Sequence, residues 1–137
     1  MNKRTLGCLA LCGLLMTSIS LLAHHSLAGV YDMKAEKELS GTIKSIKFVN
    51  PHGTLTVTVK SADGTPVDWI LSMGSATSLA GLKPVGVGPT GPNALRFGDS
   101  VKVKFIPAMN GSPLGFLKTI TYADGHVVVV SMGGPND

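Results

Sequence analysis

Four histidines, His24, His25, His52 and His126, have side chains that can bind a metal ion. If a leader were removed after Ala23, His24 would present its α-amine and its imidazole from one residue, and that pair can chelate a metal ion. A further imidazole would complete three nitrogen ligands in a near-planar arrangement. Such a ligand set suits Cu(II), which also leads the divalent first-row ions in affinity. The histidines therefore predict a site for copper or a similar divalent metal at the N-terminus.

The third nitrogen ligand has two candidates in the sequence. His52 is the distant candidate, because the turn-forming residues over 50–53 leave a side chain free to point outward. His25 is the local candidate. His126 follows an Asp-Gly pair and is expected to be a hairpin side chain, so the predicted metal ligands are His24, His25 and His52. A polar tail without metal is the alternative, since no spaced ligand set of the zinc kind is present.

Residues 1–23 have the three parts of a secretory signal peptide. A positive start precedes an apolar run from Leu6 to Met16, which is too short to span a bilayer comfortably. Small and polar residues then lead to Ala23. Cleavage after Ala28 would remove both N-terminal histidines, and Ala23 is preferred because it lies nearer the apolar run. We expect a periplasmic or secreted protein with no membrane span once the leader is cleaved.

The rest of the composition argues against several classes of protein. Both cysteines, Cys8 and Cys12, lie in the leader, so the mature chain would have no disulfide and no thiol nucleophile. Without Lys3 and Arg4 it has ten basic residues against eight acidic ones, a net charge of +2 that is too small for a typical nucleic-acid binder. It has no paired catalytic carboxylates and no serine in a nucleophile elbow. We therefore expect a binding protein rather than an enzyme.

The elements that would position the histidines are mainly strands, because apolar and polar residues alternate with a period of two from Leu39 onward. Near Lys44 and Ser45 the alternation shifts by one residue, which indicates a β-bulge. A short helix is predicted over 75–82, with Ser75 as its N-cap. A Gly- and Pro-rich loop follows over 83–92. The predicted strands cover 39–48, 54–60, 67–72, 101–105, 115–122 and 127–130.

Three strands, a short helix and further strands follow the order of an OB-type barrel. We expect a mainly β, OB-like barrel of five to six strands with one short helix. The binding loops of such a barrel would be Asn50 to Gly53 and Pro107 to Pro113. An immunoglobulin-like sandwich is the competing fold, but it needs about seven strands and no helix.

The chain divides into a leader over 1–23, an N-terminal segment over 24–38, the barrel over 39–132 and a disordered tail over 133–137. One domain accounts for this length. The barrel core is expected to bury Val57, Trp69, Val103 and Phe105, while His52 stays exposed on its turn.

The sequence resembles the DUF6152 family, an uncharacterised family of small exported proteobacterial proteins. The resemblance rests on a combination of short segments across most of the mature chain: His24-His25-Ser26, Leu39-Ser40-Gly41-Thr42-Ile43, Asn50-Pro51-His52, Trp69, Gly74-Ser75 and Phe97-Gly98-Asp99. It implies a periplasmic β-domain without an established activity. It also implies that His24, His25 and His52 belong together, because the family pattern includes these three histidines and not His126.

Two functions remain open from the sequence. The first is an exported periplasmic binding protein that holds copper or a similar divalent ion through an N-terminal histidine site. The second is an accessory module that binds a periplasmic protein or a glycan through its barrel loops and holds no metal. The sequence leaves the oligomeric state and the identity of the partner open.

Overall fold

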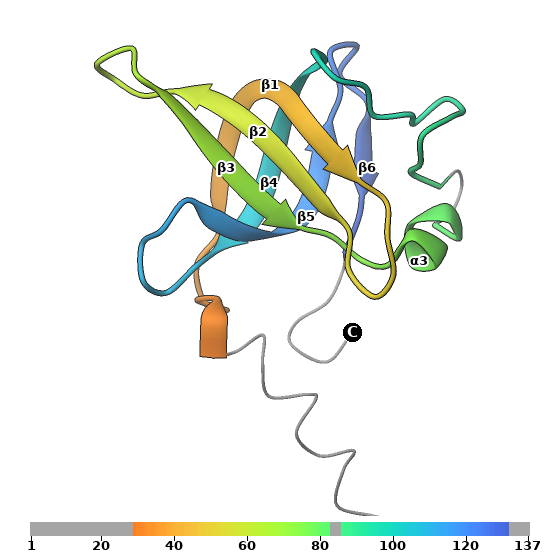
Figure 1. The fold of residues 1–137 in the computed structure, drawn as a ribbon, viewed down its shortest axis with the longest axis horizontal. Coiled ribbons are helices and arrows are strands. Elements are labelled where there is room, and N and C mark those ends of the chain that lie inside the picture. Colours follow the sequence, from red (N-terminus) through yellow and green to blue (C-terminus); the bar gives the residue numbers. More distant parts are fainter. Residues whose placement is uncertain (1–28, 83–85, 132–137) are drawn as a thin grey trace, which may run out of the picture.

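The computed structural model describes residues 29–82 and 86–131, and Figure 1 shows their arrangement. The order of elements is the one that the sequence pattern predicts, with strand ends close to the expected ones. The elements are β1 Lys37–Lys47, β2 Thr54–Lys60, β3 Pro66–Ser72, α3 Ala76–Ala80, β4 Ser100–Pro107, β5 Leu114–Thr121 and β6 Val127–Val129.

The strands form one sheet in the order β3-β2-β1-β4-β5-β6, and a further pairing between β3 and β5 closes it. That closing pairing is parallel and joins Ile70 to Leu114 and Ser72 to Phe116. Five strands therefore make a closed barrel, and β6 is attached to β5 outside the closure. The OB-like barrel is confirmed for the described residues, which do not form the two stacked sheets of a sandwich.

β1 carries the bulge that its shifted alternation predicts. In the pairing with β2, Ile43 lies opposite Val57 and Ser45 lies opposite Thr56, so Lys44 is the extra residue. A bulge bends its strand and increases the local twist. The bend lets one long strand pair with both β2 and β4, which closes that side of the barrel.

The barrel encloses one apolar core. Val57, Val103 and Phe105 are fully buried, as predicted. Trp69 is only partly buried, so the prediction of its burial is wrong. Its ring packs against Phe105 with the ring centroids 5.1 Å apart. The β3–β5 pairing that closes the barrel begins at Ile70, one residue beyond Trp69.

The helix α3 forms where the sequence predicts it. Ser75 is its N-cap, and the Ser75 side chain accepts a hydrogen bond from the backbone N–H of Ser78 at 3.1 Å. This bond satisfies one of the free N–H groups at the start of a helix. Leu79 is buried and Leu82 is partly buried against the core, so the helix covers the end of the barrel next to the β1–β2 turn.

Several predictions fall outside the described residues. They concern the leader over 1–23, the two histidines His24 and His25, and the tail over 133–137. Within 29–82 and 86–131, no helix is both long enough and apolar enough to cross a membrane.

Candidate functional site

The β1–β2 turn presents His52 at the surface, as the sequence predicts. The turn is held against the segment before α3, because the N–H of Gly53 donates to the carbonyl oxygen of Gly74 at 3.1 Å and the N–H of Met73 donates to that of Gly53 at 2.9 Å. Among residues 29–82 and 86–131, no side chain or backbone group forms a hydrogen bond or an ion pair with the His52 imidazole. Its ring nitrogens are therefore free to bind a ligand.

The other two predicted ligands, His24 and His25, precede the described residues. In the part of the chain that the structure describes, no three His, Cys, Asp or Glu side chains are grouped as a metal site. Of the three predicted ligands, the structure therefore describes only His52. It also describes how the segment after His25 is attached to the barrel from residue 29 onward.

That segment is attached to the loop between β4 and β5. The N–H of Met109 donates to the carbonyl oxygen of Val30, and the N–H of Asp32 donates to that of Pro107, both at 2.9 Å. Between these bonds Tyr31 forms a β-bridge with Ala108. At Tyr31 the chain therefore lies beside one of the two loops that the sequence predicts as a binding surface, held there by a single bridge and two backbone hydrogen bonds.

The side chain of Tyr31 makes a second attachment, to β3 and β5. Its hydroxyl oxygen lies 2.9 Å from the hydroxyl oxygen of Ser72 and shares a hydrogen bond with it. Its ring lies 5.9 Å from that of Phe116, and the residue is only 8% exposed. The sequence did not predict this role of Tyr31, although the apolar pair Val30-Tyr31 in a polar segment was a usable signal.

Both ring nitrogens of His126 lie beside hydrogen-bonding oxygen atoms, and His126 differs from His52 in that respect. Its Nδ1 lies 2.5 Å from a carboxylate oxygen of Asp124, and its Nε2 lies 3.1 Å from the side-chain oxygen of Asn93. Its ring stacks on Tyr122 with the centroids 4.3 Å apart and the planes 7° apart. The imidazole therefore holds the β5–β6 hairpin to the loop before β4, consistent with the predicted hairpin role.

Two residues in contact with the His126 ring, Asp124 and Tyr122, have pKa values shifted in opposite directions. Hydrogen bonds from the backbone N–H and then the ring of His126 lower the pKa of Asp124. Burial, and secondarily the charge of Asp99, raises the pKa of Tyr122 to about 12. The Tyr122 hydroxyl donates to the carbonyl oxygen of Asn93 at 2.8 Å. Tyr122 is thus neutral near pH 7 and acts as a fixed hydrogen-bond donor.

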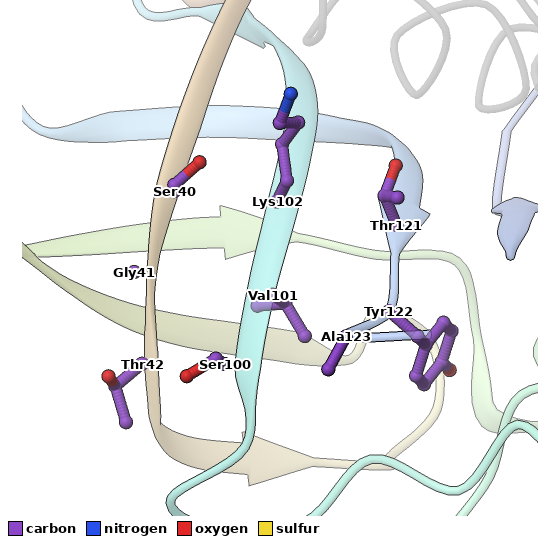
Figure 2. A pocket seen from close by; sticks show the side chains of 9 residues that line it. All are labelled: Ser40, Gly41, Thr42, Ser100, Val101, Lys102, Thr121, Tyr122 and Ala123. Atoms are coloured by element: carbon purple, nitrogen blue, oxygen red, sulfur yellow. The ribbon is translucent and has the colours of Figure 1, made fainter. Parts of the chain in front are cut away.

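An open groove crosses the outer face of the barrel over β1, β4 and β5 (Figure 2). Its volume is about 460 Å³, and a smaller depression of about 280 Å³ continues it toward Arg96 and His126. Four hydroxyl side chains line the groove without a hydrogen-bond partner in the described chain: Ser40, Thr42, Ser100 and Thr121. Neither loop predicted as a binding surface lines it. The sequence did not predict this groove, because the four residues come from three separate strands, β1, β4 and β5.

Comparison with known proteins gives one match. The model of a family described as "Family of unknown function (DUF6152)" matches residues 12–118. No curated protein and no solved structure matches the chain significantly.

Proposed function

The chain belongs to the DUF6152 family, and we propose that it is an exported periplasmic binding protein that holds copper or a similar divalent metal. In this proposal the leader over 1–23 is removed, and His24 becomes the first residue. The α-amine and imidazole of His24 supply two ligands, and His25 or His52 supplies the third. Nitrogen ligands in this number and arrangement favour Cu(II).

One observation supports this assignment above the others, and it is the contrast between the two described histidines. His52 is exposed and its imidazole has no hydrogen-bond partner within the described part of the chain, whereas both ring nitrogens of His126 face oxygen atoms of Asp124 and Asn93. A metal ligand must offer a free lone pair on nitrogen. Only His52, among the described histidines, meets that requirement without breaking existing contacts.

The test is metal analysis of untagged protein recovered from the periplasm, followed by calorimetric titration with Cu(II). We expect about one equivalent of metal and a dissociation constant below micromolar. A variant with one methionine placed before His24 is the sharpest control, because it moves the α-amine off His24 and keeps every imidazole. It should bind Cu(II) far more weakly. Binding no tighter than micromolar in the untagged protein would exclude the metal proposal.

A second candidate function is favoured by the groove over β1, β4 and β5. An accessory module that binds a protein or a glycan needs polar groups free to pair with a ligand, and the four groove hydroxyls are free in the described chain. Titration of isotopically labelled protein with soluble peptidoglycan fragments tests this function. Amide shifts confined to residues such as Thr42, Ser100 and Thr121 would support it, whereas shifts that avoid the groove, or no shifts, would count against it.

A further inference from the structure

We propose that the outer edge of β6, Val127–Val129, binds a second copy of this chain, so that two barrels join through an antiparallel β6–β6 pairing centred on Val128. This surface is separate from the predicted metal site and from the groove over β1, β4 and β5. Neither a metal ion nor a groove ligand takes part in the pairing.

The hydrogen bonds between β5 and β6 determine which residues of β6 face β5. The N–H of Val130 donates to the carbonyl oxygen of Lys118 at 2.7 Å. The carbonyl oxygen of His126 accepts a hydrogen bond from the N–H of Tyr122 at 3.0 Å. Backbone groups in an antiparallel pair point to the same side at every second residue. Val128 therefore also directs its backbone groups toward β5.

The backbone groups of Val127 and Val129 point the other way, toward an edge that ends the sheet outside the closed barrel (Figure 1). Neither their N–H groups nor their carbonyl groups have a hydrogen-bond partner among the residues that the structure describes. An unpaired edge of this kind is a template for another strand. Charged residues, proline or a bulge commonly protect such an edge, and β6, with three consecutive valines, has none of them.

This edge is complementary to itself. A two-fold axis through Val128, perpendicular to the sheet, places Val127 of one copy opposite Val129 of the other copy. Each such pair exchanges two hydrogen bonds, because both residues direct an N–H and a carbonyl group outward. The pairing therefore satisfies the free backbone groups of both edges and leaves none over. A closed two-fold dimer is also the commonest form of soluble oligomer.

The side chains at the same positions also suit a second copy. Val127 is 57% exposed and Val129 is 44% exposed, and both lie on the outer face of the sheet. In the dimer each Val127 packs against Val129 of the other copy, and β-branched side chains pack well across paired strands. β6 has no charged residue, so the pairing brings no like charges together. A foreign strand can use the same backbone groups, but every second copy brings the matching valines in the matching register.

The pairing has a consequence for the groove over β1, β4 and β5. A two-fold axis perpendicular to the sheet keeps the outer faces of both copies on the same side. Thr121, which lines the groove, lies opposite Val127 in the β5–β6 pairing. The β6 strands of the two copies separate their Thr121 residues, which makes three strand spacings or about 14 Å. The dimer therefore presents two grooves side by side to a ligand with a repeating structure, which raises its avidity.

The strength of the dimer follows from the size of the interface. Three residues of each strand bury far less than the roughly 1,600 Å² of a standard stable interface, so we expect a weak dimer with a dissociation constant on the order of 100 μM. Sedimentation equilibrium of untagged protein recovered from the periplasm, at about 10 μM to 1 mM, covers this range. A protein that stays monomeric throughout this range would overturn the proposal.

Two variants of β6 and one matched control test which surface forms the dimer. Val127→Lys places a charge on the edge. Val129→Pro removes an outward N–H, a change that an edge strand tolerates. Ile70→Lys is the control, because Ile70 lies on β3 and is also 44% exposed. We expect both β6 variants to dimerise at least tenfold more weakly than the wild type, and Ile70→Lys to dimerise like it. A dimer that either β6 variant leaves intact, or that Ile70→Lys weakens equally, would show that another surface is used.

Amide hydrogen exchange of the wild-type protein identifies what covers the edge without any substitution. A dissociation constant of about 100 μM leaves about 85% monomer at 10 μM and about 20% at 1 mM. Exchange at Val127 and Val129 should therefore slow about fourfold between these concentrations, while exchange at Val128, whose N–H points toward β5, changes little. Slow exchange at Val127 and Val129 at every concentration would mean that the same chain covers the edge. Slowing only after other periplasmic proteins are added would mean a foreign strand, and either result rejects the second copy.

Discussion

Two histidines of the same sequence have opposite environments in this protein. The imidazole of His126 bridges Asp124 and Asn93 and stacks on Tyr122, while that of His52, on an exposed turn, has no hydrogen-bond partner among the residues that the structure describes. A side chain that already has partners must give them up to bind a ligand, and each lost hydrogen bond costs free energy. The His52 imidazole can therefore bind a ligand without losing a hydrogen bond to the described residues, whereas the His126 imidazole cannot.

The replacement of each histidine tests that difference. We expect His52→Ala to weaken Cu(II) binding at least tenfold, which corresponds to about 1.4 kcal/mol. His126→Ala should leave the affinity unchanged and lower stability instead, because it removes the contacts to Asp124 and Asn93. Calorimetry and thermal unfolding measure the two effects. An equal loss of Cu(II) affinity in both variants would contradict the assignment of His52 as a ligand.

A carboxylate in the β2–β3 hairpin gives a pH-dependent prediction. Hydrogen bonds from the Ser61 hydroxyl and then from Thr65 lower the pKa of Asp63 to about 2, whereas an unfolded Asp has a pKa of about 3.9. The unfolded state therefore binds the proton more readily, and the stabilisation from Asp63 is present above about pH 4 and lost toward pH 2. The free energy of unfolding should fall less steeply over this range in Asp63→Asn, as measured by urea unfolding. Identical slopes in the two proteins would disprove this account.

Among the secondary-structure elements, local patterns predicted most of the fold. Alternation identified the strands, its shift at Lys44 identified the bulge, and Ser75 identified the start of α3. Each of these signals lies within a few adjacent residues. They also placed His52 on an exposed turn.

The features that the sequence did not predict depend on contacts between distant segments. Tyr31 is held by Ser72, 41 positions away, and His126 is held by Asn93, 33 positions away. Trp69 is only partly buried, although it lies on the same face of β3 as the fully buried Leu71. Alternation within a strand says which face a residue points to, but not which partner covers that face.

The β1–β2 turn depends on a glycine that has no room for a side chain. A Cβ at Gly53 would lie 2.7 Å from the carbonyl oxygen of Lys47, a backbone atom that cannot move aside cheaply. Gly53→Ala should therefore lower the free energy of unfolding by about 1 to 3 kcal/mol. Gly74→Ala is the matched control, because its Cβ would meet the nearest atom at an ordinary 3.6 Å. Denaturant unfolding compares them, and similar stabilities for the two variants would refute the steric argument.

For the chain as a whole, the proposed function depends on where the leader is cut. We expect intact-mass analysis of protein recovered from the periplasm to show a chain that begins at His24. A chain that begins at Gly29 would lack both His24 and His25. That result would end the metal proposal in its present form and leave the accessory-module function.

Metal binding by the mature protein should also depend on pH in a definite direction. An α-amine has a pKa of about 8 and an imidazole about 6.5, and both must be deprotonated to coordinate a metal. Affinity for Cu(II) should therefore fall steeply as the pH drops from about 6.5 to 5. Titrations in buffers of different ionisation enthalpy should show proton release on binding. An affinity that is flat across this range would argue against nitrogen ligands.

The short parallel pairing between β3 and β5 has a consequence for how the molecule fluctuates. Only the pairs from Ile70 to Ser72 close the barrel, and Ile70 and Leu114 are 44 positions apart in the chain. Regions with few stabilising contacts open locally without global unfolding. Amide hydrogen exchange should therefore be faster at Ile70, whose N–H donates to Pro113, than at Val57 in the β1–β2–β3 ladder. The barrel would then transiently open along this line, beside Trp69, whose fluorescence can report the opening.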